Sequence, residues 1–146
     1  MQNKKLIATA AALSALAVAT AVYAHKEKHT AEQLEAFNQV FMEQVKTGDE
    51  LFHGDPAAEK RLGVTLSRTG MACAMCHPFA SDVHPHEFPK FQEQMNQYAT
   101  LRDMINWCIE KPNEGEKIDP DGEAMKALEA YIYWSNRNSK LDPGRH

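Results

Sequence analysis

Residues 71–77 read Met-Ala-Cys-Ala-Met-Cys-His, and this stretch decides how the 146-residue chain is interpreted. It contains Cys73 and Cys76, two of the three cysteines in the chain, and His77 follows the second cysteine directly. Cysteines at this spacing occur in haem-attachment sites, in zinc sites and in redox-active dithiols. The rest of the sequence has to separate these three kinds of site.

The stretch matches the C-x-x-C-H pattern of covalent haem attachment, in which two thiols bind the haem and the histidine binds its iron. A redox-active dithiol favours a strand–helix–strand setting, which this sequence does not predict. A zinc site needs two more ligands, and Cys108 with a histidine of His84–His86 matches no usual zinc spacing. We therefore predict one covalent haem c, attached through Cys73 and Cys76, with His77 as an iron ligand.

The N-terminus has the pattern of a secretory signal peptide. Two lysines precede an apolar run over residues 6–22, and a Val-Tyr-Ala cleavage site ends at Ala24. The alternative is a transmembrane anchor, but the run is slightly short for a span and is rich in Ala and Thr. We predict a signal peptide over residues 1–24 and a soluble haem domain over residues 25–146, exported to the periplasm or an equivalent compartment.

Charge and cysteine content agree with an exported protein that has a protein partner. The net charge is −4, from 16 Lys and Arg against 20 Asp and Glu, and cleavage after Ala24 would remove two lysines and give −6. An acidic chain argues against nucleic acid and anionic membranes as partners and favours a basic patch on a partner protein. Since thiols in an oxidising compartment are normally paired or metal-bound, the third cysteine, Cys108, needs a ligand or burial.

Apolar periodicity predicts an all-α fold of several short helices. Thr30 and Gln33 fit a capping box that opens the first helix, and Gly48 interrupts or ends it. The apolar side of this helix is Leu34, Phe37, Phe41 and Val45. Further helices are predicted over Gln92–Ile109 and Glu123–Arg137, with an irregular connection over residues 54–70. Such short helices bury little apolar surface, and a haem would fill the middle of the domain.

Two further stretches resemble class I cytochromes c. They are Gly48–Phe52, ahead of the haem motif, and residues 123–134, which read EAMKALEAYIYW. In that family the first and last helices cross at a contact between a glycine and aromatic residues. The resemblance places this contact at Gly48 and Phe52 against Tyr131 and Trp134. It implies a class I cytochrome c-like fold, with the helices packed around one covalently bound haem.

Several residues are candidates for the second axial ligand of the iron. Class I cytochromes commonly use a methionine beside a proline, but Met95, Met104 and Met125 have no such neighbour and fit core positions of helices. His84 and His86 are chemically acceptable ligands, although they also fit a surface loop. The residue types alone leave this choice open.

The last third of the chain resembles the SoxA and thiosulfate dehydrogenase type cytochromes. The matching residues are Arg102, Ile105, Asn106, Cys108, Gly115, Met125, Ala127, Tyr131 and Ile132. In those proteins the cysteine is an axial thiolate of a haem with His/Cys ligation, which implies that Cys108 is the distal ligand here. Packing as a small, inert apolar side chain is the alternative for Cys108.

The number of haem motifs separates this chain from thiosulfate dehydrogenases, which have two where this sequence has one. The small monohaem cytochromes of the NaxL/NaxS type are closer in size, and they also have His/Cys ligation and pair as heterodimers. This second resemblance implies that the partner is another small cytochrome.

Three functions follow from these features. The first is electron transfer, as a low-potential carrier or redox subunit, because a thiolate from Cys108 opposite His77 would stabilise Fe(III). The second is a binder or sensor of NO or CO, which would use the site opened when the distal cysteine leaves the iron. The third is a subunit of a thiosulfate- or sulfur-oxidising cytochrome. Arg102 and Lys111 are the cations near Cys108 in the sequence that could bind such an anion. We expect a carrier or gas binder rather than an enzyme.

Overall fold

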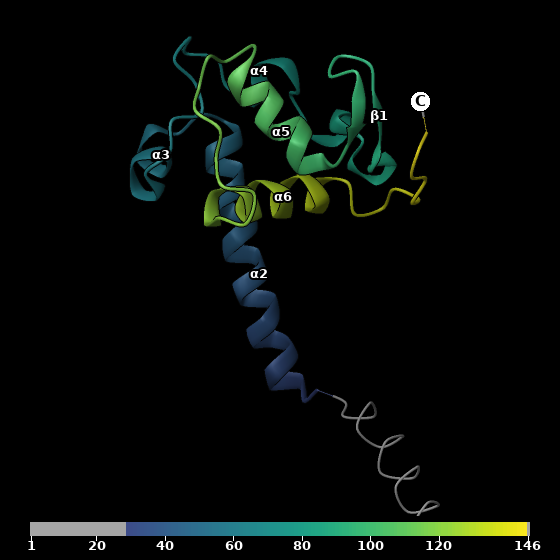
Figure 1. Cartoon of the computed structure of the whole chain (residues 1–146). Coiled ribbons are helices and arrows are strands. Elements are labelled where there is room, and N and C mark those ends of the chain that lie inside the picture. Colours follow the sequence, from purple (N-terminus) through teal and green to yellow (C-terminus); the bar gives the residue numbers. More distant parts are fainter. Residues whose placement is uncertain (1–28, 146) are drawn as a thin grey trace, which may run out of the picture. The chain divides into compact units, whose positions relative to one another are not determined.

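A computed structural model describes residues 29–145 of the chain. The helices are α2 (Ala31–Phe52), α3 (Pro56–Leu62), α4 (Cys73–Cys76), α5 (Leu101–Glu110) and α6 (Glu123–Ser135), with 3-10 turns η1 (Ser81–Val83) and η2 (Pro85–Glu87) and strands β1 (Lys90–Gln92) and β2 (Gln97–Ala99) (Figure 1). The predicted all-α class is confirmed. The predicted signal peptide, residues 1–24, lies outside the described residues. Within residues 29–145, no helix has both the length and the apolar character needed to cross a membrane.

The chain divides into two compact units between Phe37 and Asn38. In the first unit the structure describes the opening turns of α2, where the predicted capping box is present. The amide of Gln33 donates to Oγ1 of Thr30 over 3.1 Å, and the amide of Thr30 donates to Oε1 of Gln33 over 2.9 Å. Leu34 and Phe37, on the predicted apolar side, are exposed. The periodicity therefore predicted the helix correctly but not the burial of its first turns.

In the second unit, α6 crosses the C-terminal part of α2 at Gly48 (Figure 1). A Cβ atom on Gly48 would overlap the carbonyl oxygen of Ala127 and would lie 2.7 Å from the Cβ of Tyr131. Only glycine allows the two backbones to approach this closely. The helix runs on to Phe52, so Gly48 does not end it.

Aromatic side chains surround this crossing, as the resemblance to class I cytochromes implied. The rings of Phe52 and Tyr131 lie 5.2 Å apart between centroids, in a tilted arrangement. Trp134 packs instead against Phe41, with centroids 6.1 Å apart. The crossing is thus confirmed, with Phe41 rather than Phe52 as the partner of Trp134.

A helix that the sequence analysis did not predict, α3, lies within residues 54–70. Its N-cap is Asp55, whose side chain accepts a hydrogen bond of 2.8 Å from the amide of Ala57. Pro56 is its first residue, and Gly63 ends it in the left-handed conformation with φ of 64°. The start and stop signals were present in the sequence, but the helix is too short to show a periodic pattern.

The helix predicted over Gln92–Ile109 is wrong in its first half. Residues 90–99 form an antiparallel hairpin, and α5 begins only at Leu101. Thr100 and Asp103 form a capping box at that point, with the Thr100 amide donating to Oδ2 of Asp103 over 2.8 Å. This cap fixes the start of α5 and leaves the preceding residues free to pair as strands.

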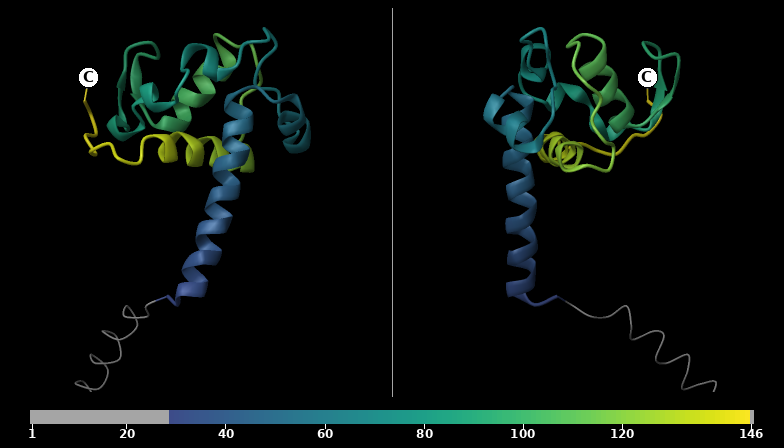
Figure 2. Two further views of the ribbon diagram at one scale, coloured as in Figure 1. Left: turned by 180° about the vertical axis from the view of Figure 1, so that it is seen from behind. Right: turned by 60° about the vertical axis from the view of Figure 1, so that its left-hand side comes forward.

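The helices α5, α6 and the end of α2 lie close together (Figure 2), and they supply most of the large side chains of the buried core of the second unit. Its largest fully buried side chains include Leu51 of α2, Ile109 of α5, and Met125 and Leu128 of α6. These helices also supply much of the lining of the cavity described next.

Candidate haem-binding site

One cavity of about 380 Å³, in the second unit, brings together the four residues singled out by the sequence analysis. Cys73 and Cys76 reach it from α4, His77 from the C-terminal end of α4, and Cys108 from α5. No disulfide joins any two of the three cysteines. Two elements separated in the sequence by the whole hairpin therefore place every thiol of the chain at the same cavity.

The remaining lining of this cavity is mainly apolar. It comprises Phe52, Ala72, Val83, Phe88, Leu101, Met104, Ile105, Trp107, Pro112, Leu128 and Ile132, with Asp82, Gln92, Gln94 and Asn113 as its polar members. Apolar walls suit the flat, apolar macrocycle of a haem, and the two thiols and one imidazole are the donor set that a haem c requires. The residues present thus fit the predicted group.

A single helical turn arranges the motif. Cys73 and Cys76 begin and end α4, and residues three apart lie on the same side of a helix. The amide of His77 donates to the carbonyl oxygen of Cys73 over 2.9 Å, which holds His77 against the end of the turn. This backbone conformation places the two thiols and the imidazole at one cavity.

Asp82, in η1, faces the imidazole of His77. Its Oδ1 atom lies 3.6 Å from Nδ1 of His77. A carboxylate on this side of the ring leaves Nε2 available for a metal, and such a partner orients a ligating imidazole and raises its basicity. Asp82 was not predicted from the sequence, where the available signal was an acidic residue shortly after the motif.

The thiols of α4 and α5 influence each other's ionisation. Burial raises the pKa of Cys73 to about 11, and the Cys108 thiol contributes to the increase. Burial likewise raises the pKa of Cys108 to about 11, with Cys76 as the second cause. In the absence of a metal all of this favours neutral thiols, whereas a bound metal ion would favour the thiolate.

Two of the candidates for the second axial ligand line the cavity. Met104 and Cys108 are four residues apart on α5 and both belong to the lining. Met125 is fully buried in the core and is not part of the lining. Met95 and the histidines of His84–His86 are not part of it either. Of the candidates named from the sequence, Met104 and Cys108 are therefore the two that line the cavity, and the identity of the second iron ligand stays a prediction.

The residues that resemble the SoxA pattern position the segment around Cys108. Nδ2 of Asn106 donates to the carbonyl oxygen of Ile118 and Oδ1 accepts from the amide of Ile118, each over 2.9 Å. A Cβ atom on Gly115 would overlap the carbonyl oxygen of Leu66 and lie 2.7 Å from that of Thr65. Asn106 thus fixes the loop after α5, and Gly115 allows that loop to pass close to the chain ahead of the haem motif.

The two cations near Cys108 are bound to carboxylates. Nε of Arg102 donates to Glu129 over 3.0 Å and Nη1 donates to Asp121 over 2.9 Å. The hydrogen bond that Arg102 donates to Glu129 is the main reason that the pKa of Arg102 is raised. Nζ of Lys111 lies 3.6 Å from Glu110. An anionic substrate would have to compete with these carboxylates for either cation.

A mainly helical domain whose C-x-x-C-H motif opens onto an apolar cavity is a cytochrome c domain. The SoxA/TsdA cytochrome c domain model matches residues 64–141, which is more than half of the chain, and the chain belongs to this family. Membership implies that the domain binds haem c. The predicted resemblance to the SoxA and thiosulfate dehydrogenase cytochromes is therefore confirmed, whereas the resemblance to the NaxL/NaxS type stays a prediction.

Among solved structures, the chain is similar to the thiosulfate dehydrogenase (TsdBA) from Marichromatium purpuratum in its "as isolated" form. The TM-score is 0.52 at 20% sequence identity, and the match covers 70% of this chain and 24% of that chain. This similarity concerns the fold, and the matched region is about a quarter of the longer protein. No curated protein matches the chain.

Proposed function

We propose that this chain is a monohaem electron carrier or redox subunit with His77 and Cys108 as axial ligands. The observation that carries the proposal is that Cys108 lines the same cavity as Cys73, Cys76 and His77. The haem, when bound, supplies a one-electron redox centre. A thiolate ligand favours the ferric iron, so the proposed carrier has a low potential.

Each residue of the site has a separate part in this proposal. Cys73 and Cys76 hold the haem covalently, and His77 binds from the motif side with its ring oriented by Asp82. Cys108 would supply the second iron ligand from α5. The mainly apolar walls of the cavity would pack against the macrocycle.

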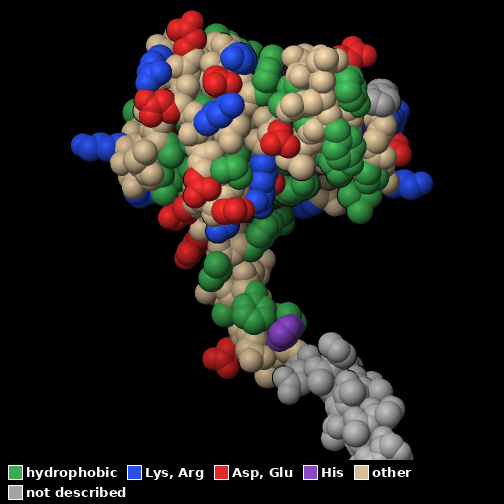
Figure 3. Space-filling view, in the orientation of Figure 1, with side chains coloured by type: hydrophobic (Ala, Val, Ile, Leu, Met, Phe, Trp, Pro, Cys, Tyr) green, Lys and Arg blue, Asp and Glu red, His purple; other side chains and the backbone are tan. Residues whose placement is uncertain are grey.

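The partner in this proposal is a redox protein, such as a second small cytochrome, met in an extracytoplasmic compartment. The acidic net charge of −4 supports a partner with a basic patch. On the face drawn in Figure 3 the described Lys and Arg side chains are interspersed with Asp and Glu. This face therefore favours individual ion pairs with a partner protein over attraction to a surface of uniform charge.

Spectra of two α5 variants test the ligation. In Cys108→Ala we expect a changed low-spin ferric spectrum and a midpoint potential higher by about 120 mV or more, a hundredfold change in a one-electron equilibrium. Met104→Leu is the matched control, since it nearly conserves volume on the same side of α5, and it should leave both quantities unchanged. An unchanged spectrum in Cys108→Ala would overturn the proposal, and a changed spectrum in Met104→Leu alone would assign the methionine.

Membership of the SoxA/TsdA family favours a second candidate function, a subunit of a thiosulfate-oxidising system. The ion pairs that occupy Arg102 and Lys111 weigh against a thiosulfate site beside Cys108. Turnover of thiosulfate by the holoprotein with an artificial electron acceptor, lost in Cys108→Ala, would favour this candidate over a simple carrier. Binding of NO or CO stays a prediction, which a Soret shift of the reduced protein under CO would support.

A further inference from the structure

A group of metal-ligating side chains lies outside the haem cavity, at the turn formed by η2. His84, His86 and Glu87 each offer one ligand atom, and these atoms lie within 4.8 Å of one another. The two imidazole rings are 5.7 Å apart between centroids, with their planes 75° to each other. None of the three residues lines the haem cavity, so they are available for a different role.

The turn brings His84 and Glu87 to the same side. Residues three apart are superposed along a 3-10 helix, and here the amide of Glu87 donates to the carbonyl oxygen of His84 over 3.1 Å. His84 has a φ of 50°, a left-handed conformation that non-glycine residues seldom adopt. Pro85, between the two histidines, is fully buried and anchors the turn in the fold.

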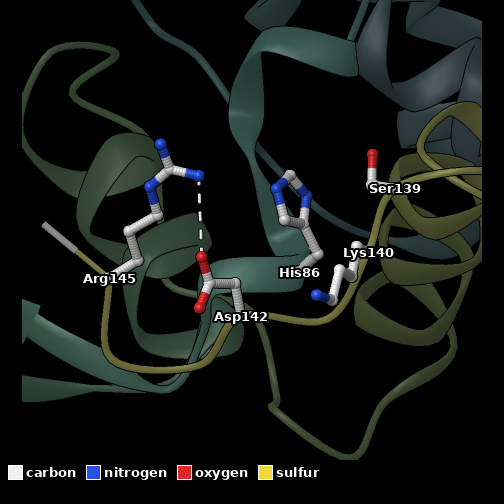
Figure 4. Close-up of a pocket in the computed structure, with 5 residues that line it drawn as sticks. All are labelled: His86, Ser139, Lys140, Asp142 and Arg145. Atoms are coloured by element: carbon white, nitrogen blue, oxygen red, sulfur yellow. Dashed lines mark ion pairs between the residues drawn. The ribbon is translucent and has the colours of Figure 1, made fainter.

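The C-terminal tail, residues 136–145 after α6, contacts the other side of the turn. The amide of Asp142 donates to the carbonyl oxygen of His86, and the amide of Gly144 donates to that of Glu87, both over 3.0 Å. The His86 ring projects into a pocket of about 290 Å³ between the turn and this tail (Figure 4). Contacts from two distant parts of the sequence thus fix the backbone that carries the ligands.

The polar atoms of this group are incompletely satisfied. Nδ1 of His86 is buried and has no hydrogen-bond partner among the described residues. Buried polar atoms nearly always have a partner, and one without calls for an unseen ion or water. Oε2 of Glu87 accepts a hydrogen bond from Nζ of Lys90 over 2.7 Å, which leaves the second carboxylate oxygen for another partner.

We propose that His84, His86 and Glu87 bind a divalent transition-metal cation of the Zn²⁺ class, separate from the haem iron. Two imidazoles and a carboxylate suit Zn²⁺, Cu²⁺ and Ni²⁺ and disfavour Mg²⁺ and Ca²⁺, which prefer oxygen ligands. Bonds of about 2.0–2.2 Å around a tetrahedral ion place ligand atoms about 3.3 Å apart, so the side chains close around the ion by rotating on a fixed turn. Water takes the fourth position.

Equilibrium dialysis of the untagged holoprotein against Zn²⁺ at one fixed pH tests this site, with zinc and iron measured in the same sample. We expect one tightly bound zinc per protein chain, and at least a tenfold loss of affinity in both His84→Asn and His86→Asn. The control His29→Asn changes an exposed histidine in the first unit and should bind as the wild type does. Wild-type affinity in the double variant His84→Asn/His86→Asn would overturn the proposal.

Two further measurements separate this site from the haem and from misfolding. The Soret band should be the same in all of these variants, and a shift in either histidine variant would assign that residue to the haem and overturn the proposal. Lys90→Gln removes the cation 2.7 Å from Glu87, so zinc should bind several-fold more tightly. Unchanged or weaker binding in Lys90→Gln would exclude Glu87 as a ligand.

Discussion

Asp82 and Cys108 bring negative charge to the proposed iron site from different elements. Asp82 of η1 lies 3.6 Å from His77, and Cys108 of α5 lines the cavity. Carboxylates behind a ligating imidazole raise its basicity, and a thiolate also favours the higher oxidation state of iron. Both residues are therefore expected to lower the midpoint potential, Cys108 as a ligand and Asp82 through His77.

Replacing the carboxylate tests this effect. In Asp82→Asn we expect a midpoint potential higher by up to about 60 mV, a tenfold change in a one-electron equilibrium, with the absorption spectrum unchanged because the ligands are retained. Glu43→Gln, at an exposed position on α2, makes the same change in net charge and should leave the potential unchanged. Redox titration of the three proteins measures both values, and equal shifts in the two variants would mean that overall charge, not the contact with His77, is responsible.

At the residue scale the sequence identified the predicted haem-binding residues but not the side chains that surround them. Cys73, Cys76 and His77 follow a local pattern, and Cys108 was found through a family resemblance. Asp82 carries only a weak local signal, an acidic residue shortly after the motif, because its place at the cavity depends on how η1 packs. The choice between Met104 and the other two methionines likewise needed the fold, since all three fit helical core positions in the sequence.

Among the elements, the crossing of α2 and α6 depends most on a single residue. A side chain on Gly48 would meet the backbone of Ala127, and α6 can move away only by disturbing Leu128 and Ile132, which line the cavity. The helices α2 and α6 therefore couple their own packing to the shape of the proposed haem site.

We expect Gly48→Ala to lower the free energy of unfolding by about 1–3 kcal/mol, the usual cost of overpacking. A decrease is the opposite of the usual result, because a glycine-to-alanine change at an exposed position inside a helix raises the free energy of unfolding by about 1 kcal/mol. Lys46→Ala, at an exposed position on the same helix, serves as the control and should be nearly neutral. Denaturant unfolding of the holoproteins measures the change in the free energy of unfolding. A Gly48→Ala variant more stable than the wild type would show that the α2–α6 crossing can accommodate a Cβ atom.

Sequence periodicity predicted elements well where helices are long and poorly elsewhere. The start of α2 and most of α6 were predicted correctly, because a capping box opens α2 and several apolar positions repeat along α6. The hairpin over residues 90–99 was taken for helix, since a short run of polar and aromatic residues fits either pattern. The exposed Leu34 and Phe37 show a further limit, because periodicity indicates an apolar side without indicating what covers it.

For the whole molecule, the proposed haem is part of the core. Residues from α2, α5 and α6 line the cavity, so a haem there would join the three helices that form the core. The all-α class and the need for a central group were predicted from the sequence. The contact between the C-terminal tail and η2 was not, because it joins residues more than fifty positions apart.

Covalent attachment can be tested with the double variant Cys73→Ser/Cys76→Ser. We expect haem stain to be absent after denaturing electrophoresis, whereas the wild type keeps one haem per chain. We also expect the Tm to fall by more than about 10 °C, since each kcal/mol lost shifts Tm by about 4 °C or more in a small domain. Haem that stays with the variant through denaturation would contradict attachment by these two cysteines.

The two hydrogen bonds between the tail and η2 have a mechanical consequence. A force applied at the C-terminus, for example by a fused domain, would reach His86 and Glu87 before it reached α5 or the haem motif, because Asp142 and Gly144 are tied directly to that turn. The turn would yield first and would shield the cavity from the load. A metal ion bound by His84, His86 and Glu87 would stiffen the turn itself, whereas the attachment of the tail would still rest on the backbone hydrogen bonds of Asp142 and Gly144.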